Sequence, residues 1–96
     1  MAEFTNDEND LYIDGKKVIK AWESFSGWFW FAIELAGENI PYNINGKKVI
    51  GNEYFGFVQG LEEEYGYFAD AELKLLMSSG KVWEIKKPNL LIAGRR

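Results

Sequence analysis

The stretch Trp28-Phe29-Trp30-Phe31-Ala32-Ile33-Glu34-Leu35 is rich in aromatic and β-branched residues and predicts a β-strand. Residues Lys17 to Phe25 predict a second strand, joined to the first by the short Ser26-Gly27 connection. We expect the two strands to pair in the middle of an antiparallel sheet. Side chains alternate between the faces of a strand, which places four apolar residues together as candidate core: Phe29, Phe31, Ile33 and Leu35. The other face carries Trp28, Trp30, Ala32 and Glu34, and its two tryptophans either pack beneath another layer or form an aromatic shelf open to a ligand.

Two tight turns lie on either side of these strands. Asp14-Gly15 and Asn45-Gly46 are each followed by Lys-Lys-Val-Ile, so Gly-Lys-Lys-Val-Ile occurs twice with an offset of 31 residues. Glycine accepts the positive φ of two-residue hairpin turns, so each turn predicts a β-hairpin. Recurrent hairpin chemistry explains this repeat more simply than a duplicated unit does, because the sequences after Ile19 and Ile50 differ.

The remainder of the chain predicts a strand, an acidic loop, a helix and a last strand. The strand Tyr54–Gly60 contains Gly56, whose missing side chain leaves a notch that Trp28 or Trp30 could fill. The other three elements are an acidic loop over residues 61–66, a helix over about residues 70–79 with Asp70 as N-cap, and a strand over residues 82–85.

These elements predict an α+β fold, in which one helix from the C-terminal half packs on a small, mainly antiparallel sheet. We expect one domain over residues 1–96, because a chain of this length is too short for two. Within it we predict a flexible acidic end at residues 1–10, a globular core at residues 11–87 and a basic tail at residues 88–96.

Composition excludes several kinds of chemistry. The chain has no Cys and no His, so it has no thiol nucleophile, no imidazole base, no zinc finger and no disulfide framework. Its longest apolar run, Trp28 to Ile33, is far too short for a membrane-spanning helix, which needs roughly 20 residues. The acidic N-terminal sequence is also unlike a signal peptide. We expect a soluble, cytoplasmic protein.

Charge is unevenly distributed along the chain. Residues 1–72 carry fourteen acidic and five basic side chains, a net charge of −9, whereas residues 73–96 carry one acidic and six basic side chains, a net charge of +5. An acidic body repels phosphate backbones and attracts basic proteins. Charge therefore favours a protein partner.

Several motifs together resemble a known family. They are Trp28-x-Trp30 followed by Glu34, the block Phe55-Gly56-x-Val58-x-Gly60-Leu61-Glu62-x-Glu64-x-Gly66-Tyr67-Phe68, and Glu72-Leu73. Over about residues 17–73 the chain resembles an uncharacterised domain family of small proteins that plasmids, phages and other mobile elements often encode. It departs from the family pattern at Phe29 and at Ala69-Asp70-Ala71. The resemblance implies an accessory protein and no particular activity.

The candidate site residues are aromatic and acidic. Paired carboxylates for catalysis would have to come from Glu34, Glu62 and Glu64, but Glu62-Glu63-Glu64 is typical of a solvated loop. We predict no catalytic residues, no metal site and no cofactor. The sequence favours a non-enzymatic function over an enzymatic one but leaves enzymatic activity open. The candidate binding residues are Trp28, Trp30, Glu34, Glu62, Glu64 and Tyr67.

Two functions fit these residues. The first is a non-enzymatic module that binds another, basic protein with an aromatic ridge inside an acidic rim. The alternative is a single-stranded nucleic-acid module, in which exposed aromatics stack on bases and five basic residues neutralise phosphates: Lys81, Lys86, Lys87, Arg95 and Arg96. We expect no membrane partner, and the sequence leaves the oligomeric state open.

Overall fold

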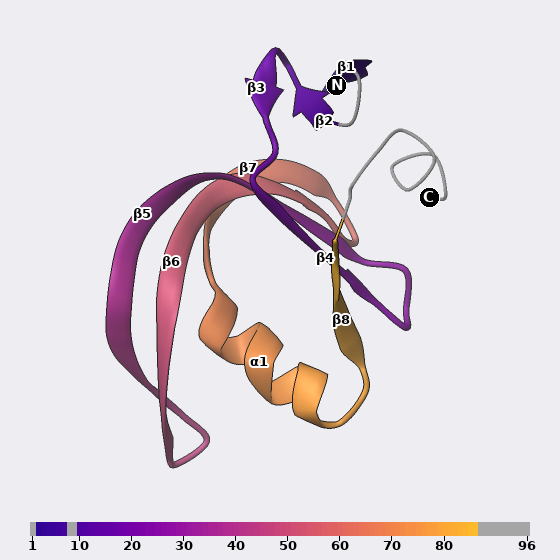
Figure 1. The fold of residues 1–96 in the computed structure, drawn as a ribbon. Helices are drawn as coiled ribbons and strands as arrows, with labels where there is room; N and C mark the ends of the chain where they lie inside the picture. Colours follow the sequence, from indigo (N-terminus) through magenta and orange to yellow (C-terminus); the bar gives the residue numbers. More distant parts are fainter. Residues whose placement is uncertain (1, 8–9, 87–96) are drawn as a thin grey trace.

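The computed structural model describes residues 2–7 and 10–86, which form two antiparallel sheets and one helix. The first sheet, in the order β1-β2-β3, consists of β1 (Phe4–Asp7), β2 (Asp10–Ile13) and β3 (Lys16–Lys17). The second, in the order β7-β6-β5-β4-β8, consists of β4 (Lys20–Ser24), β5 (Phe29–Ile44), β6 (Lys47–Gln59), β7 (Glu63–Ala69) and β8 (Val82–Ile85). Helix α1 (Asp70–Ser78) connects β7 to β8 (Figure 1).

The predicted α+β fold class is wrong, because the chain is mostly β and has two sheets. Strands account for 66% of the described residues and helix for 11%. The predicted strand Lys17–Phe25 breaks where the chain passes from one sheet to the other. The Val18 N–H donates to the Leu11 carbonyl in the first sheet, and the next N–H, of Ile19, donates to the Ala32 carbonyl in the second. Two consecutive residues therefore form backbone hydrogen bonds with strands of different sheets.

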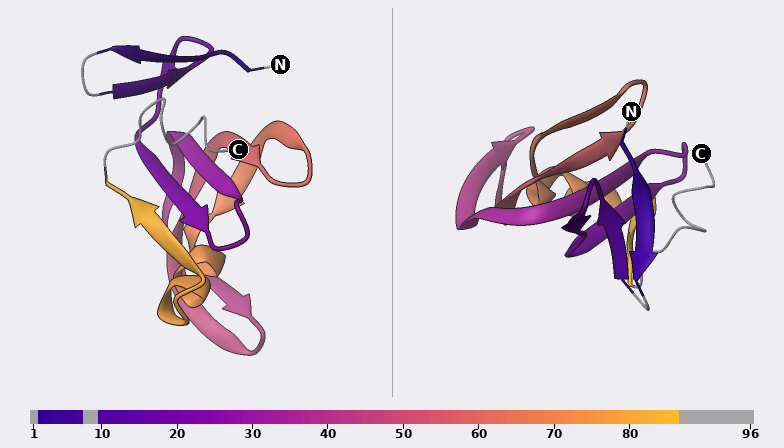
Figure 2. Two further views of the ribbon diagram at one scale, coloured as in Figure 1. Left: turned by 90° about the vertical axis from the view of Figure 1, so that its right-hand side faces the viewer. Right: turned by 90° about the horizontal axis from the view of Figure 1, so that it is seen from above.

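The five-stranded sheet is the middle layer of the molecule. The three-stranded sheet lies over one of its faces and α1 lies against the other (Figures 1 and 2). We call these the hairpin-side face, which bears Phe29, Phe31 and Phe57, and the helix-side face, which bears Trp22, Ala32 and Tyr54.

The hairpin-side core joins both sheets. Leu11, Ile13 and Val18 pack there on Phe29 and Phe31, and all five side chains are buried. Fully burying such a side chain contributes roughly 1.5–3 kcal/mol, so this layer is a major part of the fold's stability.

Residues 1–10 were expected to be a flexible end, but Phe4–Asp7 form β1, paired antiparallel with β2. The Phe4 ring makes edge-to-face contacts with Phe31 and Phe57, at centroid distances of 5.6 and 5.8 Å. One aromatic residue within a polar stretch is thus part of the core.

The helix-side core centres on Trp22, Tyr54 and Leu73, with Phe68 and Trp30 packed at its margin. A helix was predicted here with Asp70 as its N-cap, but the N-cap is Ala69, which makes no side-chain capping bond. At its other end, α1 ends at Ser78, with Ser79 as the C-cap and Gly80 directly after it. Gly80 has φ 77°, and the Lys81 N–H returns to the Leu76 carbonyl at 2.9 Å.

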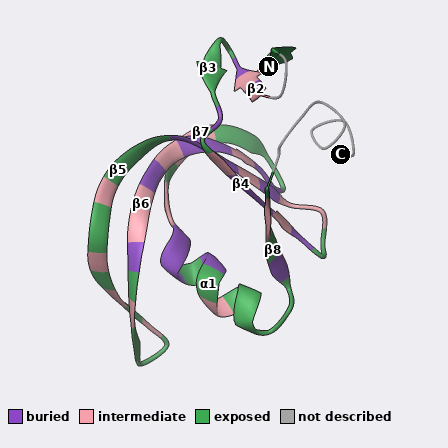
Figure 3. Ribbon diagram, in the orientation of Figure 1, coloured by how far each residue is buried: buried purple, intermediate pink, exposed green. Residues whose placement is uncertain are grey.

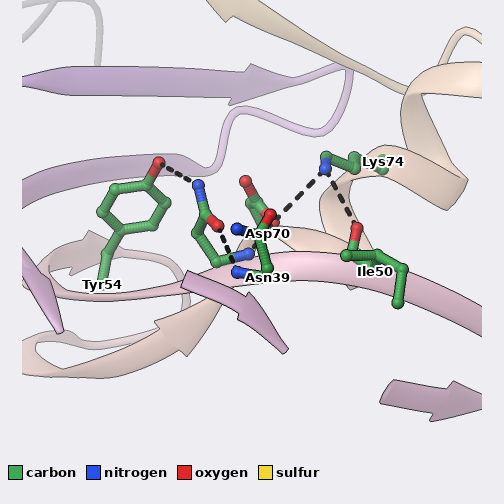
Figure 4. Close-up of polar contacts among 6 residues, drawn as sticks. Asn39, Ile50, Tyr54, Asp70 and Lys74 are labelled. Carbon is green, nitrogen blue, oxygen red and sulfur yellow. Dashed lines mark hydrogen bonds and ion pairs between the residues drawn. The ribbon is translucent and has the colours of Figure 1, made fainter. Parts of the chain in front are cut away.

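A polar network joins α1 to the long β-hairpin (Figure 4). The Asp70 carboxylate, on a residue only 4% exposed, accepts a hydrogen bond from the Asn52 N–H at 2.8 Å. The Lys74 ammonium lies 3.9 Å from the same carboxylate and donates to the Ile50 carbonyl at 3.1 Å. Asn52 also accepts from the Asn39 N–H, which ties the helix start to both strands of the hairpin.

Both predicted hairpin turns are confirmed. Asp14 and Gly15 have φ 52° and 80°, and Asn45 and Gly46 have φ 52° and 81°. Positive φ at both central residues is the geometry of a two-residue type I′ turn, which suits Asp-Gly and Asn-Gly. The two turns close β2–β3 and β5–β6, so the repeated sequence reflects turn chemistry in two different sheets.

Strands β5 and β6 are much longer than predicted, and they curve over α1 (Figure 1). The register between them shifts at Ala32/Glu34, Leu35/Gly37 and Gly37/Ile40, and such bulges bend a strand. The far ends of both strands and the outer side of α1 are largely exposed (Figure 3).

Gly56 lies opposite the first of these bulges. A Cβ there would be 1.9 Å from the Phe31 carbonyl oxygen. The neighbour that requires this glycine is therefore the backbone of β5, and the prediction that Trp28 or Trp30 fills the notch is wrong.

Candidate functional site

The six predicted site residues lie on both faces of the five-stranded sheet. In the register of β5, β6 and β7, Trp30 is opposite Val58 and Val58 is opposite Glu64. Cross-strand neighbours point to the same face, and Trp30 packs on the helix-side core, so this row lies on the helix-side face.

A second row of the same strands lies on the hairpin-side face. Glu34 is opposite Phe55, and Phe55 is opposite Tyr67. The Phe55 ring contacts the rings of Tyr67 and Tyr65, and Tyr65 packs on the hairpin-side core. The Tyr67 side chain, which is 69% exposed, therefore points to the face opposite the tryptophans, although Tyr67 also contributes to the edge of a pocket that Trp30 lines.

The bulge at Ile33 explains why simple alternation placed Glu34 wrongly. Ala32 pairs with Gly56 and Glu34 with Phe55, so one extra β5 residue stands between two consecutive β6 residues. Shifting the register by one residue moves the following side chains to the other face. Leu35, predicted to be core, is accordingly 44% exposed.

Trp28 and Trp30 form a fixed pair at one end of the helix-side face. Their ring centroids are 5.9 Å apart with an interplanar angle of 32°. Ser24 holds the backbone of Trp28, since its N–H donates to the Trp28 carbonyl and its hydroxyl accepts from the Trp28 N–H at 3.1 Å. A Cβ on Gly60 would lie 2.4 Å from the Trp28 ring, so the ring rests directly on this glycine.

Neither of the two alternatives for the tryptophans describes them fully. Both side chains are partly buried, with an exposed remainder. Packing holds them in place while part of each ring stays accessible.

A pocket of about 300 Å³ opens beside Trp28. It is lined by Trp28, Val58, Leu61, Glu62 and Glu64. Leu61 is 93% exposed at its margin, and two carboxylates but no Lys or Arg line it. We call it the Trp28 pocket.

A second pocket, of about 370 Å³, lies where α1 faces β5 and β7. Its lining residues are Trp30, Tyr42, Glu53, Tyr67, Phe68, Ala69, Glu72, Leu73 and Leu76. A neighbouring pocket of about 350 Å³ shares Glu72 and Leu76 with it, so the two flank one side of α1. We call the pair the α1 groove.

Acidic residues near the α1 groove affect the pKa of Tyr42, which lines it. Burial raises the pKa of the Tyr42 hydroxyl, and the charges of Glu53 and Asp70 raise it further. Each of these causes opposes formation of another negative charge there.

The predicted acidic loop is shorter than expected. Glu63 and Glu64 already belong to β7, so the connection from β6 consists of residues 60–62. Alternation then separates neighbouring glutamates: Glu64 lines the Trp28 pocket, whereas the Glu63 carboxylate accepts from the Gln59 amide at 3.4 Å on the other face. Of these three consecutive glutamates, Glu62 and Glu64 line the pocket beside Trp28 and Glu63 does not.

Sequence reasoning did not identify Val58, Leu61 or Glu72 among the residues that line these pockets, nor Gly60 as the support of the Trp28 ring. The i, i+4 spacing of Glu72 and Leu76 could have indicated a shared helix side, because such residues are neighbours on a helix. The contact of Gly60 with Trp28 has no local signal, since the two residues meet only through strand pairing.

Three of the five basic residues on which the nucleic-acid alternative depends lie outside the described residues. Lys81 and Lys86 are exposed, and Lys87, Arg95 and Arg96 lie beyond the described residues. Neither described lysine lines the Trp28 pocket. Within residues 2–7 and 10–86, no three acidic side chains are grouped closely enough to hold a metal ion. Over the same residues, no helix has the length and apolar character to cross a lipid bilayer.

Comparisons of the chain with protein-family models, with curated proteins and with solved structures found no match. The resemblance to the mobile-element family stays a prediction.

Proposed function

We propose that this chain is a non-enzymatic protein-binding module that holds a basic segment of a partner protein against the helix-side face. The observation that carries this proposal is the charge of the pockets. On the helix-side face, the three pockets that described residues line each include at least one Glu, and none of them is lined by Lys or Arg. Pockets lined by carboxylates attract cations and repel anions over a distance of about a Debye length.

Apolar anchors next to the carboxylates support a protein ligand over a free cation. Trp28, Trp30 and Phe68 offer aromatic surface on the helix-side face, and Leu76 adds an aliphatic side chain from α1. Aromatic centres with a polar rim are typical of protein interfaces, where buried anchors supply affinity and rim charges supply specificity.

The same geometry disfavours the nucleic-acid alternative. A base stacked on Trp28 would bring its phosphates close to Glu62 and Glu64, which line the same pocket. Coulomb repulsion at such short range opposes binding of a polyanion. We further propose a cytoplasmic location, with which the absence of cysteine agrees.

Affinity purification from the native cell tests the proposal. The tagged wild type is compared by quantitative mass spectrometry with the double variant Glu62→Lys/Glu64→Lys and with Glu34→Lys, which reverses a charge on the opposite face. We expect a basic protein on the wild type and on Glu34→Lys, and at least about tenfold less of it on the double variant, because like-charge contacts cost several kcal/mol. Equal recovery on all three baits, or a strongly acidic captured protein, would contradict the proposal.

A further inference from the structure

The Trp28 pocket combines an indole surface with two unpaired carboxylates. Within the described residues, neither the Glu62 nor the Glu64 carboxylate has an ion-pair or hydrogen-bond partner. The pocket of about 300 Å³ has room for roughly ten water molecules, so it can take a polar side-chain end together with its methylene groups.

The floor of this pocket is preorganised. Ser24 fixes the backbone of Trp28 through two hydrogen bonds, Gly60 supports its ring from below, and Trp30 lies beside it. A ring held in this way loses little conformational freedom when a ligand stacks on it. The pocket therefore favours a flat group over a flexible or spherical one.

Charge and shape together select one type of side chain. A guanidinium group is planar and cationic, stacks on the face of an indole and presents several N–H donors in a fixed fork. Glu62 and Glu64, two residues apart, line the pocket beside that indole and supply the acceptors. The exposed Leu61 side chain offers apolar surface for the methylenes of the same residue. A lysine ammonium would use the carboxylates but not the planar stacking surface.

We infer that the Trp28 pocket is an arginine-binding site that receives one arginine of the basic partner over Trp28 and between Glu62 and Glu64. This inference rests on the proposed function, which it deepens by naming the recognised side chain.

Short synthetic peptides test the inference on the full chain. Three fluorescein-labelled peptides alternate serine with arginine, lysine or citrulline, the last being the neutral and nearly isosteric counterpart of arginine. A single-stranded thymidine oligonucleotide serves as the anionic probe. The proteins are the wild type, Glu62→Gln/Glu64→Gln, and Glu63→Gln, which removes one carboxylate charge from the residue between them, on the opposite face.

We expect the arginine peptide to bind about fivefold tighter than the lysine peptide, because stacking on the indole adds to charge attraction. The citrulline peptide and the oligonucleotide should not bind. The double variant should weaken arginine-peptide binding by about tenfold, as loss of two charge-assisted acceptors implies, whereas Glu63→Gln should change it less than about twofold.

Each other outcome overturns the inference. Equal affinity for the arginine and lysine peptides would show charge attraction without arginine recognition, and equal effects of Glu63→Gln and the double variant would place binding elsewhere. Absence of peptide binding, or binding of the oligonucleotide, would also refute an arginine site. The capture experiment can still succeed in these cases, so failure of the arginine site and failure of the protein-binding function are distinguishable.

Discussion

The hydroxyl of Tyr65 in β7 donates a hydrogen bond to the carboxylate of Asp14, with 2.5 Å between the oxygens and 51 residues between the two positions. Asp14 lies in the β2–β3 turn, so this bond ties the three-stranded sheet to an edge strand of the other sheet. The Tyr65 hydrogen bond lowers the pKa of Asp14, and a second hydrogen bond from the Glu3 N–H lowers it further. Burial, the hydrogen bond and the Asp14 charge raise the pKa of Tyr65 to about 12.

These shifts predict how stability depends on pH. The folded-state pKa of Tyr65 is above the ordinary value of 10.0, so its contribution is complete below pH 10 and is lost as pH rises toward 12. Tyr65→Phe should therefore lose less stability than the wild type between about pH 10 and 12. The measurement is urea denaturation at several pH values, with Tyr67→Phe as the exposed control. If the free energy of unfolding fell equally with pH in the wild type and in Tyr65→Phe, the linkage would be refuted.

Asp14 affects the pH dependence of stability at acidic pH. Its folded-state pKa is below the ordinary value of 3.8, so its contribution to stability is present above pH 3.8 and is lost as pH falls through the folded-state pKa. Asp14→Asn should flatten the acid limb of the same stability curve. An unchanged acid limb in this variant would count against the Tyr65–Asp14 link.

Gly56 and Gly66, which pair across β6 and β7, should respond very differently to alanine. A Cβ on Gly56 would be 1.9 Å from a backbone oxygen, whereas a Cβ on Gly66 would meet nothing within 4 Å. Backbone cannot yield as a side chain can, so Gly56→Ala should lower the free energy of unfolding by about 3 kcal/mol or more and Gly66→Ala by less than about 1 kcal/mol. Urea denaturation of both variants measures this, and comparable losses would show that the bulge contact is not close.

Gly60→Ala should affect binding more than folding. The new methyl would press on the Trp28 ring at 2.4 Å, and the ring can shift because it belongs to a side chain. We expect a native circular-dichroism spectrum, a displaced Trp28 indole N–H signal in NMR and weaker binding of the arginine peptide. Unchanged peptide affinity, with the indole signal displaced, would mean that the position of this ring is irrelevant to binding.

The polar network at the start of α1 predicts a graded series. Asp70→Ala leaves the part-buried Asn52 N–H without its acceptor and should cost about 1–3 kcal/mol of unfolding free energy. Asp70→Asn keeps an acceptor oxygen and should cost less. Both values come from urea denaturation, and equal losses in the two variants would show that the charge near Lys74 matters more than the hydrogen bond.

The parts of the fold that local sequence dictates were predictable. Asp14-Gly15 and Asn45-Gly46 specify turns through their own φ values, and β8 and α1 follow from apolar spacing bounded by glycine. The division into two sheets was not predictable, because it depends on backbone hydrogen bonds between distant residues. Val18 pairs with Leu11 in one sheet, and Ile19 pairs with Ala32 in the other. Local sequence does not specify such pairing between distant segments.

The candidate site was predictable in composition but not in arrangement. The Trp pair and the acidic residues were identified, and the strand alternation that places them is correct as far as Ala32. Beyond it, the bulge opposite Gly56 moved Glu34 to the other face, and the alternation of β7 placed Tyr67 there too. A bulge arises from close contact between two strands, which alternation within one strand cannot reveal.

The most direct test of the binding surface follows the four indole N–H signals in NMR as the arginine peptide is added. We expect the Trp28 and Trp30 signals to shift together in a saturable way, while the signal of Trp22, which is 2% exposed in the helix-side core, stays fixed. Shifts confined to Trp83 on the outer strand β8, or none at any indole, would contradict a binding surface built on the Trp28–Trp30 pair.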